Sequence, residues 1–151
     1  MSDDLVLPSD LARAIEREGS AAYPNECCGI LFGRDVDGKA VTSGRAHRVV
    51  ERLEPVTNSY TAEEQYHRFS IEPQDLMRAE KSAQSGQLVI GFYHSHPDHP
   101  ARPSETDRQA AWPFYSYVIV SIGKGQPLDM TSWLLDEATE TFKRQEIVSE
   151  T

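Results

Sequence analysis

The chain has 151 residues, 38% of them hydrophobic and 9% aromatic, which is enough for one globular domain whose core needs no disulfides. Its formal net charge of −9 argues against a nucleic-acid partner, because no basic stripe is available to neutralise phosphates. No apolar run approaches the ~20 residues of a membrane-spanning helix, so we expect no membrane partner.

The predicted elements alternate between helices and strands. Leu7, Leu11 and Ile15 recur at helical spacing, and the turn residues of 35–38 lie between two β-prone runs. In chain order, the pattern predicts a helix over 7–23, strands over 28–34 and 40–50, a polar loop over 51–70, a helix over 73–83, a strand over 88–93, a helix over 104–111, and strands over 115–122, 128–136 and 142–147. This order indicates a single α/β domain over residues 1–151, with a mixed β-sheet between helices.

Two features bear on the cellular compartment. The acidic start, Met1-Ser2-Asp3-Asp4, lacks the basic and apolar regions of a signal peptide. Cys27 and Cys28 are the only cysteines, and sequence neighbours rarely pair with each other, so reduced thiols are expected. Both features favour a cytoplasmic protein.

The segment 94–107 concentrates the residues that carry chemistry. Side chains alternate along a strand, so His94 and His96 face the same side, about 6 to 7 Å apart along the backbone. Prolines then exclude a regular element as far as Ser104, which shares one face of a predicted helix with Asp107. Folding of the intervening loop would bring Asp107 beside the histidines. Two histidines, one carboxylate and an open fourth position have the composition of a catalytic zinc site.

Each part of this motif also has a purely structural explanation. A histidine pair is commonly a surface or core feature, and Ser104 can be simply the N-cap of a helix with Asp107 in its first turn. A second signal supports the metal site, because Glu26 stands just before the apolar run 30–32. A zinc-activated water needs such a carboxylate to take its proton.

This set of residues resembles the JAMM (MPN-plus) metalloprotease family. The family motif is matched by His94-x-His96, seven further residues, Ser104, two residues and Asp107, with Glu26 upstream before Cys28-Gly29. The resemblance runs from the first helix to about residue 122, and it is greatest to small single-domain bacterial and archaeal members.

The resemblance implies a fold, an activity and a substrate class. The implied fold is a mixed, curved β-sheet flanked by helices, with a topology like that of the cytidine deaminases. The implied activity is zinc-dependent hydrolysis of the amide bond after the C-terminal Gly-Gly of a ubiquitin-like or sulfur-carrier protein, such as a carrier–cysteine adduct. His94, His96 and Asp107 would bind Zn²⁺, while Glu26 would carry the proton and Ser104 would hold the oxyanion.

Other functions make different demands on the sequence. A zinc deaminase would need His/Cys-x-Glu followed by Pro-Cys-x-x-Cys, and neither is present. A thiol hydrolase would pair Cys27 or Cys28 with a histidine, which no spacing supports. The main alternative is a catalytically silent MPN scaffold that mediates protein–protein interaction, but such domains lose ligand positions that are intact here.

Several polar residues are not assigned to catalysis. Ser95 should point away from the two histidines and have a structural role. His99 is expected to be exposed in its proline-rich loop, and His47 and His67 are interpreted as surface or packing residues. From the resemblance, Asn58 is expected to hold a loop near the site.

Overall fold

The computed structural model describes residues 4–36, 47–56, 73–84 and 86–149. Within these ranges the elements are β1 (Asp4–Val6), α1 (Ser9–Ala22), β2 (Cys28–Val36), β3 (His47–Val56), α2 (Pro73–Ser82), β4 (Leu88–Pro97), α3 (Glu105–Ala110), β5 (Ser116–Gly123), β6 (Gln126–Asp136) and β7 (Thr141–Val148).

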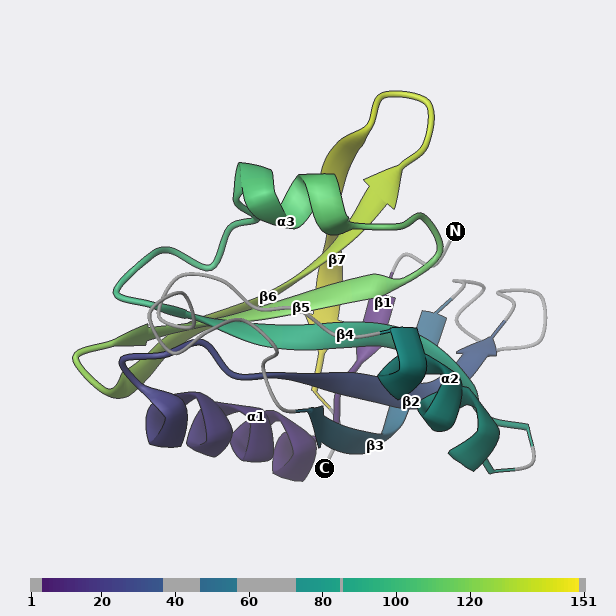
Figure 1. Ribbon diagram of the computed structural model, residues 1–151, viewed down its shortest axis with the longest axis horizontal. Helices are drawn as coiled ribbons and strands as arrows, with labels where there is room; N and C mark the ends of the chain where they lie inside the picture. Colours follow the sequence, from purple (N-terminus) through teal and green to yellow (C-terminus); the bar gives the residue numbers. More distant parts are fainter. Residues whose placement is uncertain (1–3, 37–46, 57–72, 85, 150–151) are drawn as a thin grey trace.

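The strands form one mixed sheet in the order β1-β3-β2-β4-β5-β6-β7. The pairs β1–β3, β1–β7 and β4–β5 are parallel, whereas the other neighbours are antiparallel. Because β1 pairs with both β3 and β7, the sheet curves until it closes. The helices α1 and α3 lie on opposite sides of the central strands (Figure 1). The predicted mixed, curved sheet flanked by helices is therefore confirmed.

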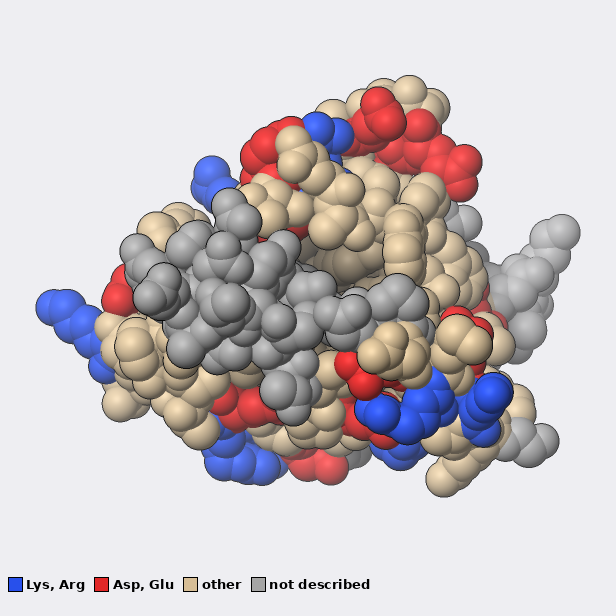
Figure 2. All heavy atoms as spheres, in the orientation of Figure 1, with Lys and Arg blue, Asp and Glu red and all other residues tan. Residues whose placement is uncertain are grey.

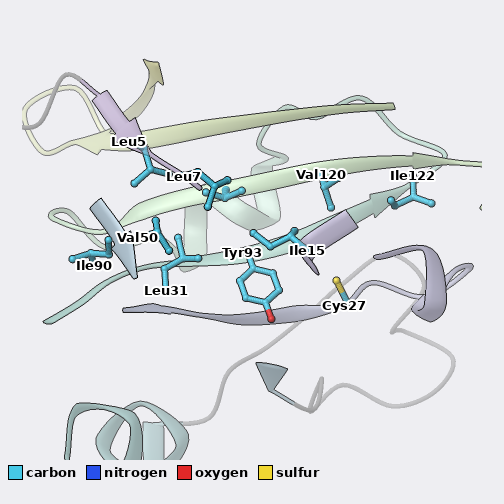
Figure 3. Packing of buried hydrophobic residues seen from close by; sticks show 11 residues of the cluster. Leu5, Leu7, Ile15, Cys27, Leu31, Val50, Ile90, Tyr93, Val120 and Ile122 are labelled. Atoms are coloured by element: carbon cyan, nitrogen blue, oxygen red, sulfur yellow. The ribbon is translucent and has the colours of Figure 1, made fainter. Parts of the chain in front are cut away.

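A buried apolar cluster joins α1 to the sheet. Ile15 of α1 points toward side chains from several strands (Figure 3). Complete burial of such a side chain contributes roughly 1.5–3 kcal/mol. The cluster contains Leu5, Leu7, Ile15, Cys27, Leu31, Val50, Ile90, Tyr93, Val118, Val120 and Ile122.

Tyr93 links this core to the strand that carries the histidines. Its ring lies against Gly29 on β2, where a Cβ atom would stand 2.1 Å from Tyr93 Cζ, so only glycine fits there. The Tyr93 hydroxyl donates a hydrogen bond of 2.7 Å to Glu18 of α1. The helix and the centre of β4 are thus held together by both packing and a hydrogen bond.

The predicted hairpin turn at 35–38 is wrong in its first half. Asp35 and Val36 continue β2 and pair with Arg48 and His47 of β3. Burial of the Arg48 guanidinium explains the longer strand, because its Nε lies 3.4 Å from Asp35 Oδ1 and its Nη1 donates to Ile90 O. The remainder of the turn and the part of the predicted strand over 40–46 lie outside the described residues.

The polar loop predicted to begin at residue 51 is also wrong over 51–56, which belong to β3. The polar side chains of this stretch find partners on the same surface of the sheet. Glu51 lies 3.0 Å from Arg34 Nε, and the Arg52 guanidinium stacks 3.9 Å above the Phe32 ring. Polar side chains with such cross-strand partners do not interrupt a strand.

Two further differences affect the strands near the site. The strand predicted over 88–93 continues to Pro97, because both histidines keep pairing with β5. The three-residue β1 was not predicted, since so short a run has no readable period.

On the face shown in Figure 2, acidic side chains gather over α3 and the β6–β7 turn, whereas basic side chains gather near α2. In the described part of the chain, no helix has the length and hydropathy needed to cross a bilayer.

Candidate active site

The two histidines lie at the carboxyl end of β4, between two strands. His94 pairs with Cys28 of β2 on one edge and with Ile119 of β5 on the other. His96 pairs with Ser121 of β5. Both imidazoles are buried, and their Nε2 atoms lie 3.1 Å apart. The prediction that they face the same side is confirmed.

Asp107 reaches the histidines from the first turn of α3. A capping box fixes this turn: Ser104 Oγ accepts from Asp107 N at 3.0 Å, and Asp107 Oδ2 accepts from Ser104 N at 2.8 Å. Asp107 Oδ2 lies 3.1 Å from His96 Nε2, and Oδ1 lies 3.4 Å from His94 Nε2. The cap therefore aims the carboxylate at the two imidazoles.

Ligand atoms of His94, His96 and Asp107 all lie within 4.8 Å of one another. His96 Nδ1 lies 2.8 Å from Pro100 O, and only a protonated nitrogen can bond to a carbonyl. In the neutral imidazole this bond leaves the lone pair on Nε2, the nitrogen that would bind a metal held between His94 and Asp107. A carbonyl partner of this kind is the usual second contact of a metal-binding histidine. This donor set fits a zinc ion with a further position open.

The charges of the three residues are strongly coupled. Burial would raise the pKa of Asp107, but the charge of His94, together with hydrogen bonds from both histidines and Ser104, holds it well below its usual range. Burial lowers the pKa of His94. The pKa of His96 is raised because the adjacent Asp107 outweighs burial. Asp107 therefore stays ionised beside the two imidazoles, and burial makes the imidazole of His94 harder to protonate.

Glu26 enters the site from the segment between α1 and β2. Cys27 O accepts from Ser95 N at 3.1 Å, and Cys27 N donates to Ser95 Oγ at 2.9 Å, so the β2–β4 pairing extends past Cys28. Continued by two residues, the register of Cys28 with His94 would put Glu26 opposite His96, and the charges of His96 and Asp107 do act on the Glu26 carboxyl group. Burial raises the pKa of Glu26 to about 8. The charge of His96 lowers this pKa and that of Asp107 raises it, and both effects are smaller than that of burial.

The raised pKa of Glu26 predicts a pH-dependent stability once a chelator has removed any metal. The folded protein holds this proton up to about pH 8, whereas the unfolded chain releases it near 4.5. The free energy of unfolding should therefore fall as the pH rises from about 4.5 through about 8. Urea titrations across this range should show a smaller fall for Glu26→Gln. Equal slopes for the two proteins would contradict the assigned burial.

The other polar residues near the motif are placed as follows. Ser95 is fully buried and binds the Cys27 amide, which confirms a structural position away from the histidines. His99 is exposed, as expected. Ser104 is exposed and caps α3, and this capping uses only its acceptor capacity. Asn58 and His67 lie outside the described residues.

The two cysteines are free and buried. Burial raises the pKa of both Cys27 and Cys28 to about 12, so neither thiol ionises near neutral pH. Because the thiolate is the reactive form of cysteine, this environment gives no support to a thiol hydrolase.

Comparison with known proteins identifies the family. Residues 8–136 match the family described as prokaryotic homologs of the JAB domain. The chain belongs to this family. That match agrees with the JAMM resemblance inferred from the motif.

Proteins similar in sequence to this chain include two with named activities. The chain is 40% identical over 108 residues to a desampylase of Haloferax volcanii, covering 70% of this chain and 69% of the relative. It is 29% identical over 147 residues to the CysO-cysteine peptidase of Mycobacterium tuberculosis, covering 97% and 92% of the two chains.

Solved structures agree with the fold. A protein of Desulfitobacterium hafniense shares 30% identity with a TM-score of 0.77, covering 97% of this chain and 92% of the other. A protein of Salinibacter ruber shares 36% identity with a TM-score of 0.67, covering 99% and 92%. A JAB1/MPN domain protein of Archaeoglobus fulgidus shares 19% identity with a TM-score of 0.57, covering 98% and 99%.

Proposed function

We propose that the protein is a zinc-dependent metallopeptidase that hydrolyses the amide bond after the C-terminal Gly-Gly of a ubiquitin-like or sulfur-carrier protein. The observation that carries the proposal is the convergence of His94, His96 and Asp107, whose ligand atoms lie within 4.8 Å of one another. Glu26 is close enough for its ionisation to depend on His96 and Asp107. Three ligands and a nearby acid–base group are the parts that metal-assisted hydrolysis needs.

Each residue has a separate task in this reaction. His94, His96 and Asp107 hold the metal, which when bound supplies Lewis acidity and lowers the pKa of a water molecule to about 7. Glu26 accepts a proton from the attacking water and returns it to the leaving amine. The burial that raises the pKa of Glu26 to about 8 favours this return near neutral pH. A nearby cation favours the carboxylate form needed to accept the proton.

Ser104 completes the set as a donor to the developing oxyanion. Its oxygen already accepts the Asp107 amide, but the hydroxyl proton remains able to donate. Capping therefore orients the Ser104 side chain without using the proton that the oxyanion requires. One such donor typically contributes a factor of about 10²–10³ to turnover.

The names of the relatives support the substrate class. The Mycobacterium tuberculosis relative is named as a peptidase of CysO-cysteine, and the alignment covers 97% of the present chain. Glycine residues suit a narrow approach to the metal because they have no side chain to clash. Over residues 91–94 both edges of β4 are already paired, with β2 and with β5, so the tail cannot join the sheet there as an added strand. We therefore propose that the tail approaches from beyond the carboxyl end of β4.

A cleavage assay tests the proposed substrate. Zinc-loaded protein is incubated with carrier proteins that end in Gly-Gly-Cys or Gly-Gly-Lys-peptide, and the products are identified by mass spectrometry. Cleavage directly after Gly-Gly is expected, and it should disappear with a chelator or in Glu26→Gln. Matched carriers with Ala-Ala in place of Gly-Gly should be cleaved more slowly. Equal cleavage of the two tails and of unrelated peptides would contradict the carrier-protein substrate.

A further inference from the structure

The loop that joins the two halves of the metal motif is held through three consecutive carbonyl groups. His99 O accepts from the Ser121 hydroxyl at 2.6 Å, Pro100 O accepts from His96 Nδ1 at 2.8 Å, and Ala101 O accepts from the Thr131 hydroxyl at 2.6 Å. The central hydrogen bond, from His96 Nδ1 to Pro100 O, therefore orients a candidate metal ligand. Its two neighbours connect the loop to β5 and β6, which lie beside it (Figure 1).

The direction of these outer hydrogen bonds is fixed by chemistry. A carbonyl can only accept, so Ser121 and Thr131 must each donate their single hydroxyl proton to the loop. Trp133 Nε1 donates to Thr131 Oγ1 at 2.8 Å, and this contact leaves the threonine proton directed at Ala101 O. Thr131 is 3% exposed, so little water is available to replace a lost bond.

The start of the same loop is also anchored. Asp98 N donates to Ile122 O at 2.7 Å. The Asp98 carboxylate accepts from the Tyr23 hydroxyl at 2.5 Å and from Lys124 N at 2.9 Å. With Asp98 fixed at one end and Ala101 at the other, the Pro100 carbonyl has little freedom to turn away from His96.

We infer that Thr131 and Ser121 are positioning residues of the metal centre, although their hydroxyl groups donate to the loop carbonyls and not to His94, His96 or Asp107. They hold the loop on either side of Pro100, so that its carbonyl keeps the His96 ring oriented with Nε2 toward Asp107. The inference rests on the proposed zinc site. It extends the site to the hydroxyl groups of two strands that lie outside the metal motif.

The substitution Thr131→Val tests the role because valine keeps the shape of threonine and removes only the hydroxyl. Thr131→Ser restores the hydroxyl and serves as the conservative rescue. Ser132→Ala is the matched control, because Ser132 is the next residue of β6, is fully buried, and donates to Gln145 Oε1 at 2.8 Å rather than to the loop. Ser121→Ala tests the second anchor independently.

The readout is zinc affinity, measured by competition with a chromophoric chelator and supplemented by the absorption spectrum of the cobalt-substituted protein. Thr131→Val and Ser121→Ala should each weaken zinc binding about 10–100-fold, as expected for groups that orient metal ligands. They should also shift the cobalt bands, whereas Thr131→Ser and Ser132→Ala should resemble wild type. If Thr131→Val does not fold, Ser121→Ala and its cobalt spectrum decide the matter.

Two results would overturn the inference alone: wild-type affinity in both Thr131→Val and Ser121→Ala, or an equal loss in Ser132→Ala, which would indicate a general effect of stability. A wild-type protein that binds no zinc would instead overturn the proposed function together with the inference. Thermal melting of the metal-free variants shows whether Thr131→Val and Ser132→Ala are destabilised to a similar degree.

Discussion

Glu26→Gln is expected to lower turnover about 10²–10⁴-fold while the protein keeps its zinc and its fold. Glutamine has nearly the same shape as glutamate but cannot accept the proton of the attacking water. Glu26 is assigned as a proton carrier and not as a ligand, so the three metal ligands should be unaffected. The measurements are kcat on a cleaved carrier substrate and zinc content by elemental analysis.

Glu18→Gln provides a matched control for this substitution. Glu18 is also partly buried, and burial raises its pKa, but its partner is Tyr93 on the α1 side of β4. The control variant should keep nearly normal turnover, since its carboxylate lies outside the set of ligands and Glu26. Near-normal turnover of Glu26→Gln, or loss of its metal, would show that the assigned role is wrong.

Asp107→Asn is expected to weaken zinc binding by more than the 10–100-fold typical of residues that only orient ligands. The asparagine oxygen can still accept from Ser104 N, so the substitution retains the cap and removes the anionic ligand. Titration with zinc against a competing chelator measures the effect. Asp107→Ala should lose the metal and also the hydrogen bond from Ser104 N, while the Ser104 hydroxyl still accepts from the backbone N–H of residue 107.

Ser104→Ala separates the capping of α3 from the binding of metal by Asp107. This variant loses the side-chain cap on the Asp107 amide, at a cost of about 1 kcal/mol, but keeps all three ligands. Because the cap helps to aim the Asp107 carboxylate, this variant should bind zinc more weakly than wild type but more tightly than Asp107→Asn. Zinc affinity of Asp107→Asn equal to that of wild type would remove Asp107 from the ligand set.

Local patterns were sufficient to predict the side-by-side placement of the two histidines. Strand alternation requires His94 and His96 to share a face, and the structure places their Nε2 atoms 3.1 Å apart. The α3 cap followed from the spacing of Ser104 and Asp107. These features depend on residues that are close in sequence, so periodicity and capping rules describe them well.

Features that depend on distant partners were not predicted. The stretch 51–56 looks like a polar loop until the cross-strand contacts of Glu51 and Arg52 are known. The short β1 is stabilised by pairing with β3 and β7 rather than by its own pattern. The role of the Pro100 carbonyl likewise required the fold, because no sequence signal marks a backbone acceptor.

On the proposed assignment, His94, His96 and Asp107 bind one catalytic zinc ion. Elemental analysis of purified wild-type protein beside a folded His94→Ala, His96→Ala double variant tests this claim most directly. We expect about one zinc per chain in the wild type, the usual count for a catalytic site, and almost none in the double variant. Full zinc occupancy in the double variant would contradict the assignment.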